Sequence, residues 1–532
     1  MAGFRRLGVA AIVAGMAYAG MSHAAVYDLN ADLSSADWLA HLNDDLLGYW
    51  DDATADPATQ SGSMPYRLCN DGSLVTYGVA CEGVTLAQSK APVQTVVGQS
   101  RQVYSYALAF HMTGNTEYLD LAKAGYEYLI SPSTFYDDTT GLYRTSYNVA
   151  TGAQSGLANV QQQAYALLGQ GFLAYVTGDA SIQAQTAAGS AAIMDRFGLQ
   201  DASGSFTGSF AQTVDGTDAG PNIVMQLDQL NAYKVLLAQT SDGAAQANVL
   251  QEALATARYL REEYFDTATG LMREQSYSSG ISISGYNYGL SAKAFWFIDQ
   301  LAQQAGDAEL SAWAQDAARK LFVTAYDADL GAWRTSQDLT GVASDTLWWW
   351  EYAELDQYAS QLAVSDPVLA QMVESAQSFW LDNFVDHRTN AVGEEYGGVF
   401  PSLVVSQDSL TGEYGVAADT NAPKHYQWIA GFHAFEHALV SYMSEAMASG
   451  EAITLYFADA ASDFTLAYGM QAQSQTVEQI LSGTTTVYAV TYTGLSYALA
   501  SAIPAVPLPA GGLLLLSGLA ALCLHKRRRR LG

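Results

Sequence analysis

The sequence predicts an all-α fold, an (α/α)6 toroid with short β-hairpin loops and a small C-terminal β extension. Six loops with a shared turn signature recur at intervals of 63, 63, 66, 61 and 62 residues. A fixed period of this length is typical of repeat architectures. Two segments that are apolar at helical spacing fill each interval, which makes six helical hairpins. An open solenoid is the alternative, but a closed ring is favoured because the copies stop at six.

The loops carry a β-hairpin signature. The clearest copies surround Gly141, Gly270 and Gly331, and each has an aromatic residue, an Asp, a turn with Gly, an apolar residue and then Arg. Weaker copies surround Gly204, Gly393 and Gly78. In a closed ring these turns are expected at one end, around a central cavity.

Twelve helices follow from the apolar spacing, and the toroid is expected to span residues 26–448. Inner helices should be richer in Trp, Tyr and Gly, and outer helices richer in Ala, Glu and Gln. The helices are expected at 37–50, 98–114, 116–130, 159–179, 182–197, 223–239, 246–265, 287–306, 310–326, 344–362, 367–384 and 424–448.

The pattern changes after the last helix. Residues 452–458, 464–470 and 484–495 alternate in polarity and are rich in β-branched and aromatic residues, which predicts strands. Residues 449–500 therefore read as a β-rich extension that packs on the ring.

The two ends of the chain read as export signals. Arg5 and Arg6 precede an apolar run and a small-residue cleavage site, which predicts a signal peptide over residues 1–25. Residues 501–532 read as a Pro-rich linker, a short transmembrane segment and a basic tail. Within them, VPLPA at 506–510 resembles a variant of the PEP-CTERM sorting signals, which implies cleavage by an exosortase-type membrane enzyme. A plain tail anchor is the alternative.

Those signals place the expected protein outside the cytoplasm, first anchored in the inner membrane and then at the cell surface or in the extracellular matrix. The formal net charge of −30 excludes nucleic acid as a natural partner. Cys69 and Cys81 are predicted to form a disulfide, because both lie in one short loop of an exported chain.

Residues His433 to His437 fit the H-x-x-E-H pattern of inverted zinc peptidases. Such a site needs a further carboxylate from a separate downstream helix, and the chain offers only strand-like sequence there. Neither a metal nor any other cofactor is therefore expected. His437 is predicted to be a buried structural histidine.

Several stretches resemble the N-acylglucosamine 2-epimerase family of sugar epimerases and aldose–ketose isomerases. They are "RQVYSYALA" at Arg101, "YNYGLSAKAFW" at Tyr286, "WWEYAE" at Trp349 and "WIAGFHAFEHALVSY" at Trp428. The resemblance covers nearly the whole ring and implies an (α/α)6 barrel that binds a carbohydrate and transfers protons beside its carbonyl.

By this resemblance, His433 is an acid/base group and Arg101 binds the oxyanion and hydroxyls. Proton transfer near neutral pH favours histidine, and a developing enediolate needs a fixed positive donor. The pocket is expected to include Trp428, Trp349, Trp350, Glu354, Tyr104, Gln226, Asp228 and Tyr288.

The sequence departs from the family at two positions. Gln226 and Leu290 stand where relatives carry histidine, and Leu290 cannot transfer a proton at all. Asp228, Glu354 and Tyr288 are the candidate substitutes. Loss of a positioned acid/base group costs about 10²–10⁴-fold in rate, so weak or absent 2-epimerase activity is predicted.

Two alternatives stay open at this point. One is a glycoside hydrolase or lyase on the same barrel, with Asp228 and Glu354 as paired carboxylates. The other is a non-catalytic carbohydrate-binding protein of the cell surface or matrix, favoured by the missing histidines.

Overall fold

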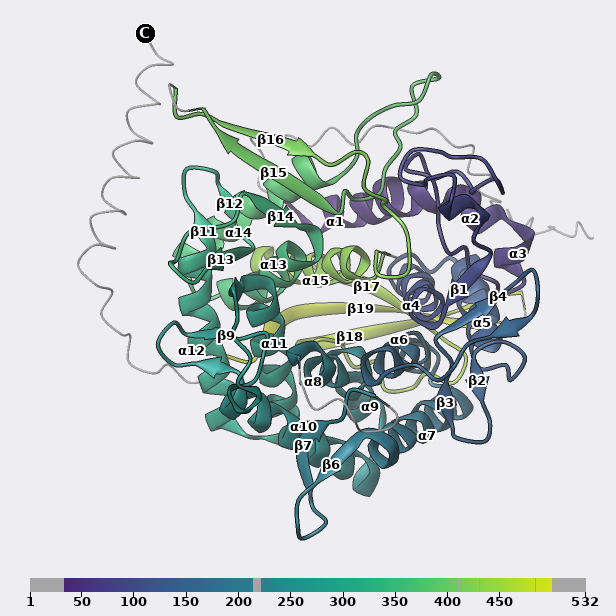
Figure 1. Ribbon diagram of the computed structural model, residues 1–532, viewed down its shortest axis with the longest axis horizontal. Helices are drawn as coiled ribbons and strands as arrows, with labels where there is room; N and C mark the ends of the chain where they lie inside the picture. The colour runs from purple at the N-terminus through teal and green to yellow at the C-terminus, as the bar shows by residue number, and fades with distance from the viewer. Residues whose placement is uncertain (1–32, 214–221, 409–410, 430, 484, 500–532) are drawn as a thin grey trace, which may run out of the picture.

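The computed structural model describes residues 33–213, 222–408, 411–429, 431–483 and 485–499. The expected signal peptide, and the expected linker, sorting motif and basic tail, lie outside these residues. The described chain confirms the predicted fold class, a ring of paired helices (Figure 1).

The inner ring consists of helices that each contact the next, and the last contacts the first. Nearly every residue of an inner helix is buried; in α4, all but Thr113 are. The inner helices are α4 (Val96–Thr113), α6 (Val160–Thr177), the continuous α8 (Ile223–Gln229), η4 (Leu230–Lys234) and α9 (Val235–Thr240), α11 (Tyr288–Ala305), α13 (Trp349–Ala363) and α15 (Phe432–Ser449).

The outer helices pack against the inner ones through one face. In α5, for example, buried Leu119, Ala122 and Tyr126 alternate with partly exposed residues at helical spacing. The outer helices are α1 (Ser35–Ala40) with η1 (His41–Leu47) and η2 (Gly48–Trp50), α5 (Thr116–Leu129), α7 (Ala180–Phe197), α10 (Gly243–Glu263), α12 (Ala308–Ala325), and α14 (Pro367–Phe379) with η6 (Trp380–Phe384). Short helices α2 (Asp51–Ala55), α3 (Pro57–Gln60), η3 (Gln88–Lys90) and η5 (Tyr277–Ser279) lie in loops.

Four of the predicted hairpins are present, and the three clearest close in the same way. The Gly141 N–H donates to the Asp137 carbonyl at 2.8 Å, and the corresponding Gly270 and Gly331 bonds are 2.7 and 2.8 Å. These glycines have φ of 72–77°, which favours Gly. The hairpin strands are β2 (Tyr136–Asp137) with β3 (Leu142–Tyr143), β6 (Gly198–Gln200) with β7 (Phe206–Phe210), β8 (Phe265–Asp266) with β9 (Leu271–Met272), and β11 (Tyr326–Asp327) with β12 (Ala332–Trp333). The weak copies near Gly78 and Gly393 form only isolated bridges.

Further short strands precede the inner helices and link neighbouring repeats at the hairpin end. They are β1 (Val93–Thr95), β4 (Ser146–Asn148) and β5 (Ala153–Gln154) in one sheet; β10 (Gly285–Asn287) with β13 (Ser336–Asp338); and β14 (Thr346–Trp348), β15 (Ser402–Gln407) and β16 (Tyr414–Ala418) in another.

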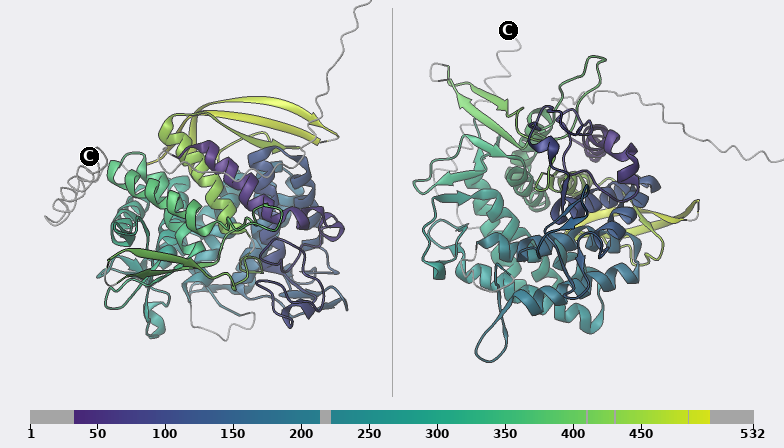
Figure 2. Two further views of the ribbon diagram at one scale, coloured as in Figure 1. Left: turned by 90° about the horizontal axis from the view of Figure 1, so that it is seen from above. Right: turned by 45° about the vertical axis from the view of Figure 1, so that its right-hand side comes forward.

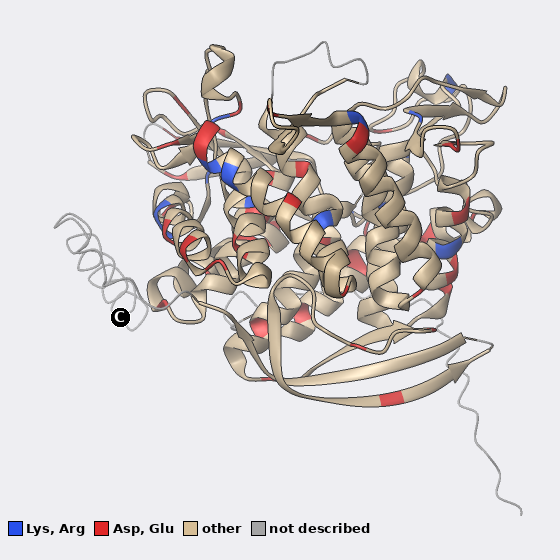
Figure 3. Ribbon diagram, turned by 90° about the horizontal axis from the view of Figure 1, so that it is seen from below, with Lys and Arg blue, Asp and Glu red and all other residues tan. Residues whose placement is uncertain are grey.

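The C-terminal extension is a three-stranded antiparallel sheet in the order β17 (Ile453–Ala458), β19 (Thr485–Tyr497), β18 (Met470–Ser482). It lies across the end of the ring opposite the hairpins (Figure 2). Its strands carry a single charged side chain, Glu478 (Figure 3).

One strand prediction in the extension is wrong. Residues 464–469, all but the last residue of the expected 464–470 strand, form a loop in which Phe464 and Tyr468 adopt φ of 51° and 57°. The strand that the sequence did not reveal is β18, whose residues are mostly exposed and polar and so lack an apolar alternation.

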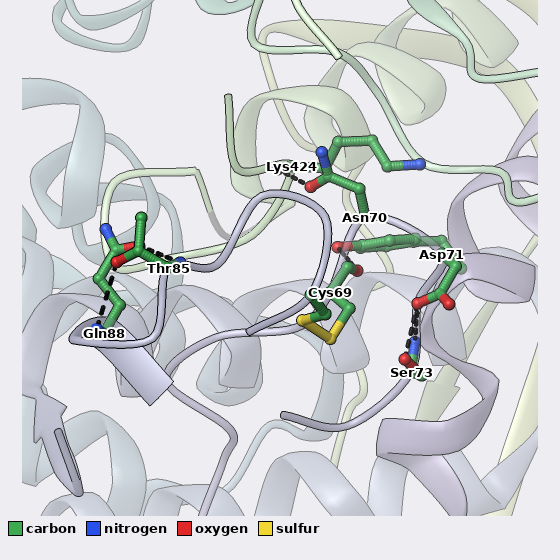
Figure 4. The surroundings of a disulfide bond; sticks show 9 residues. Cys69, Asn70, Asp71, Ser73, Thr85, Gln88 and Lys424 are labelled. Carbon is green, nitrogen blue, oxygen red and sulfur yellow. Dashed lines mark hydrogen bonds between the residues drawn. A yellow bond between two sulfur atoms is a disulfide. The ribbon is translucent and has the colours of Figure 1, made fainter. Parts of the chain in front are cut away.

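The Cys69–Cys81 disulfide is present, with the Cα atoms 5.7 Å apart. It closes a loop whose Asn70 side chain bonds the backbone of the segment that leads to α15: its Oδ1 accepts from the Lys424 N–H at 3.0 Å (Figure 4). Within the part of the chain that the structure describes, no helix combines the length and apolarity of a membrane span.

Candidate functional site

The repeat places one polar or charged side chain from each of five inner helices at the same level of the ring. The sixth residue of α4, α6, α8, α11 and α13 is Arg101, Tyr165, Asp228, Lys293 and Glu354 respectively. The α15 helix adds His433 and Glu436 from its first turns. All these side chains are buried at the centre, although charged side chains are seldom fully buried unless paired.

Lys293 contacts two carboxyls on one side of this cluster. Its Nζ donates to the Asp228 Oδ1 at 2.8 Å and lies 3.9 Å from the Glu354 Oε1. Burial alone would lower the pKa of Lys293, but the charges of Asp228, Tyr165 and Glu354 outweigh burial and raise it. Lys293 is therefore a permanent cation at neutral pH and not a base.

His433 is the imidazole of the cluster. Its Nδ1 lies 3.2 Å from the Glu354 Oε1, although neither atom is aligned for a hydrogen bond. Burial, with the positive charges of Arg101 and Lys293, holds the pKa of His433 well below its ordinary value. The imidazole is therefore neutral at neutral pH and can accept a proton.

Two carboxyls adjoin this imidazole. Burial raises the pKa of Glu354 well above its ordinary value, against the opposing charge of Lys293. Burial also raises the pKa of Glu436, to about 7, while Lys293, Tyr468, Tyr104 and Arg101 oppose that rise. The Glu436 carboxyl is thus poised to exchange a proton near neutral pH.

Arg101 lies in an aromatic cage. Its guanidinium carbon is 4.3 Å from the centre of the Tyr165 ring, 5.2 Å from that of Trp428 and 5.3 Å from that of Phe432. One of its N–H groups donates to the Trp428 carbonyl. The Nε has no hydrogen-bond partner, which leaves a fixed positive donor available at the centre.

The approach to the cluster is aromatic and lies at the hairpin end. The ring centres of Trp350 and Trp349 are 5.9 and 6.3 Å from that of His433. Trp350 and Trp428 are half-buried, whereas His433 is only 4% exposed. Aromatic walls with a few polar groups suit a sugar.

Two expected pocket residues, Gln226 and Tyr288, make contacts outside the cluster. Gln226 exchanges two hydrogen bonds with the backbone of Phe210, at 2.7 and 3.0 Å. The equivalent residue one repeat earlier, Gln163, holds Tyr143 in the same way, so Gln226 supports a hairpin. The Tyr288 hydroxyl donates to the Gln337 side chain at 2.6 Å in the hairpin layer.

The positions of Leu290 and Tyr104 differ from each other. Leu290 is 3% exposed and packs in the core. Tyr104 does reach the cluster, where its hydroxyl pairs with that of Tyr468.

His437 belongs to a structural contact. Its Nε2 is 2.7 Å from the Asp356 Oδ2, and its ring packs on Trp38 and Trp380 with centres 4.7 and 4.6 Å apart. The two histidines of the H-x-x-E-H pattern therefore serve different groups.

In the part of the chain that the structure describes, two groups of side chains are spaced closely enough to hold a cation. Ligand atoms of Glu354, His433 and Glu436 lie within 4.8 Å of one another, and the second group is Asp45, His387 and Glu395. In the first group, the Lys293 ammonium already supplies positive charge beside Glu354. We therefore treat the first group as an acid–base cluster.

Sequence reasoning missed Lys293, Tyr165, Glu436 and Tyr468. The repeat contained the signal for the first two, because Tyr165 and Lys293 stand 64 and 192 residues after Arg101 at equivalent helix positions. Tyr468 carried no such signal, because it comes from the extension.

The fold and the site define a class of protein, an (α/α)6 barrel with a buried acid–base cluster that aromatic side chains cover at the hairpin end. The sequence pattern of the N-acylglucosamine 2-epimerase (GlcNAc 2-epimerase) family matches residues 84–396, more than half of the chain. The chain belongs to this family.

Solved structures share the fold. A sugar epimerase from a ruminal bacterium superposes with a TM-score of 0.60 at 15% identity, over 77% of this chain and 98% of that one. Cellobiose 2-epimerase from Spirochaeta thermophila DSM 6192 gives 0.60 at 16% identity, over 77% and 96%. A D-mannose isomerase gives 0.58 at 14% identity, over 76% and 97%. No curated protein matches the sequence.

Proposed function

We propose that the protein is a sugar isomerase that interconverts an aldose and its 2-ketose, with His433 as the proton-transfer group and Arg101 as the oxyanion binder. The observation that carries the proposal is the one-sided placement of the acid–base groups. His433, Glu436 and Glu354 come from the neighbouring helices α15 and α13. On α8 and α11, Asp228 and Lys293 are bound to each other.

This asymmetry favours isomerisation over 2-epimerisation. Epimerisation removes a proton from C2 on one face and returns it on the other, so it needs a transfer group on each face. Isomerisation through a cis-enediol moves the proton from C2 to C1 on one face, and one group suffices. Gln226 and Leu290, where a second group would be expected, supply none.

The proposed steps balance within the sugar. Neutral His433 removes the C2 proton while the Arg101 guanidinium stabilises the developing negative charge on O1. The O2 hydroxyl gives up its proton and O1 gains one, through a carboxyl of the cluster. His433 then delivers its proton to C1. The C2–H bond is lost and a C1–H bond is formed, and no electrons leave the sugar.

The glycosidase alternative is less well supported. A hydrolytic pair needs one carboxyl that is free to protonate the leaving group and another that acts as nucleophile or base. The Lys293 ammonium lies 2.8 Å from Asp228 and 3.9 Å from Glu354, so it binds both expected carboxylates.

The test is product analysis in heavy water. The full chain is incubated with D-mannose, D-glucose, N-acetylglucosamine and cellobiose, and products are followed by ¹H and ¹³C NMR. We expect a ketose with deuterium at C1 and little 2-epimer from the three sugars that carry a 2-hydroxyl, and no ketose from N-acetylglucosamine, which has nitrogen at C2. A rapidly formed 2-epimer with deuterium at C2 would show that a second group acts on the opposite face. Binding without turnover on every sugar would make the protein a carbohydrate-binding member of the family, and the proposal would fail.

A designed variant sharpens this test. Leu290→His returns an imidazole to α11, so it should raise 2-epimer formation relative to ketose if the site accepts the ring. A matched control is Leu301→His near the other end of the same buried helix, which should not change the ratio.

We also propose that the protein is exported and sorted to the cell surface, through an exosortase-type enzyme and a transient inner-membrane anchor. The signal-like first 25 residues, the VPLPA motif and the disulfide support this proposal. Mass spectrometry of the mature protein should find cleavage after residue 24 or 25 and near residues 506–510. An intact basic tail in the mature protein would contradict the sorting step.

A further inference from the structure

One side chain of the C-terminal extension, that of Tyr468, lies near the axis of the ring. Tyr468 lies in the loop between β17 and β18 and is 2% exposed. Its ring stacks on Trp296, with centres 5.6 Å apart and planes 25° apart. Its carbonyl accepts from the Gln361 Nε2 at 3.0 Å.

The backbone of Tyr468 is held in an unfavourable conformation. Its φ of 57° lies in the left-handed region, which residues other than Gly rarely adopt. Such conformations persist only where surrounding contacts enforce them, and they gather at functional sites. The contacts to Trp296 and Gln361 supply that enforcement from two different helices.

The Tyr468 hydroxyl reaches the acid–base cluster. It hydrogen bonds with the Tyr104 hydroxyl of α4. The bond between the two hydroxyls uses one of their two protons, so one proton remains to be donated to the Glu436 carboxyl, and both tyrosines lower the pKa of that carboxyl. The charged and titratable groups around Glu436 are Arg101 and Tyr104 from α4, Lys293 from α11, Glu354 from α13, His433 on its own helix, and Tyr468.

We propose that Tyr468 is a positioning residue of the reaction centre. Together with Tyr104, it holds the Glu436 carboxylate beside His433, so the reaction centre needs the C-terminal extension as well as the ring. This inference rests on the proposed role of His433. When His433 takes a proton it becomes an imidazolium, and a carboxylate within 4.8 Å stabilises that charge. Hydrogen bonds from tyrosine hydroxyls favour the ionised carboxyl.

Tyr468 belongs to the C-terminal extension and not to the helical ring. The family match ends at residue 396, and Tyr468 lies 72 residues further on. The contribution to the site therefore comes from outside the matched region.

The first experiment compares Tyr468→Phe with Tyr492→Phe in the full chain. Tyr492 is a matched control, because it is also a buried tyrosine of the extension whose hydroxyl makes one bond, to the Phe464 carbonyl at 2.5 Å. Loss of a hydrogen bond to a charged group should raise the pKa of Glu436 by about one unit. We expect the acidic limb of the kcat profile to move up by about one pH unit, with about 5-fold lower kcat at pH 7 and unchanged KM. Tyr492→Phe should leave the limb in place.

The second experiment does not depend on activity. The protein is labelled with ¹³C at the glutamate side-chain carboxyls, and the Glu436 signal is assigned by its loss in Glu436→Gln. NMR titration should give a pKa of about 7 in the unmodified protein and a higher value in Tyr468→Phe. Tyr104→Phe should raise it as well, and serves as the second variant if Tyr468→Phe does not fold.

The outcomes separate the two proposals. An unchanged Glu436 pKa in a folded variant lacking either hydroxyl overturns the positioning role, whatever the activity. A raised pKa in a protein that turns over no sugar supports the contact, and it is then the proposed isomerase function that fails.

Discussion

A buried carboxyl near the hairpin end and one near the sheet end differ in their hydrogen bonding. At the hairpin end, beneath half-buried Trp350 and Trp428, both carboxyl oxygens of Glu354 and the Nδ1 of His433 have no hydrogen-bond partner. At the sheet end, the buried Asp299 carboxylate accepts from Ser311 at 2.6 Å, and from Tyr358 and Tyr497 at 3.0 and 2.8 Å.

The difference indicates that Glu354 and His433 serve the reaction, whereas Asp299 serves the stability of the fold. An unpaired buried polar group costs free energy, and in the cluster around His433 a bound sugar can supply the missing partner. A fully paired one ties elements together. Tyr497 belongs to the extension and Asp299 to α11, so the Asp299 cluster attaches the sheet to the ring.

The largest effect is expected at the hairpin end. His433→Gln removes the proton acceptor but keeps a polar side chain, so turnover should fall by about 10²–10⁴-fold. The free energy of unfolding should change little, because the imidazole has no hydrogen-bond partner on Nδ1. Turnover is followed by NMR and stability by urea denaturation, with half-buried His387→Gln as the control outside the cluster. Full activity in His433→Gln would move the reaction centre elsewhere.

At the sheet end, we expect a substitution to lower stability rather than turnover. Asp299→Ala leaves three buried hydroxyls without their acceptor, so the free energy of unfolding should fall by about 3–5 kcal/mol. The matched control is Asp316→Ala in the next helix, whose carboxylate is 39% exposed and pairs only with Lys320, and it should cost well under 1 kcal/mol. Urea denaturation measures both. Equal losses in the two variants would show that the paired cluster does not hold the two parts together.

The sequence predicted the ring better than the site, for physical reasons. Helical spacing and the repeated Asp-to-Gly turn are local signals, and they fixed inner and outer helices and four hairpins. His433 and Arg101 could be recognised because they lie in motifs. The roles of Lys293 and Glu436 depend on contacts with residues that are distant in the sequence. Lys293 bonds to Asp228, and Glu436 lies beside Tyr104. Tyr468 could not be found, because its position depends on a left-handed turn inside an apparent strand.

Removal of the disulfide tests whether stability and sugar binding depend on the loop that it closes. Cys69 and Cys81 are separated by 12 residues, and a loop of this size implies about 2–3 kcal/mol of stabilisation. The double variant Cys69→Ser, Cys81→Ser should lose that amount in guanidinium denaturation and become insensitive to reducing agent. Because Asn70 bonds the backbone of Lys424, four residues before Trp428, the KM for sugar should rise as well. A stability loss without any change in KM would show that the entrance does not depend on this loop.

The smallest expected effect is a pH dependence of the contact between the ring and the sheet. The Nδ1 of His111, near the end of α4, lies 2.8 Å from the Tyr456 carbonyl of β17. The rings of Phe172, Tyr175 and Phe457 surround it. Burial lowers the pKa of His111 from 6.5 to about 4, although the bond to Tyr456 opposes that shift.

Acid should therefore weaken the contact between His111 and the sheet. As the pH falls below about 6.5, His111 takes up a proton in the unfolded chain but stays neutral in the folded one, so its contribution is present above that pH and is lost towards pH 4. His111→Asn keeps a donor for the Tyr456 carbonyl but cannot titrate. Between pH 7.5 and pH 5, the unmodified protein should lose about 1–2 kcal/mol more stability than this variant in urea denaturation. His425, whose pKa is also lowered to about 4, is present in both proteins and cancels in the comparison. Identical losses would mean that His111 is already solvated, and that the sheet does not seal this end of the ring.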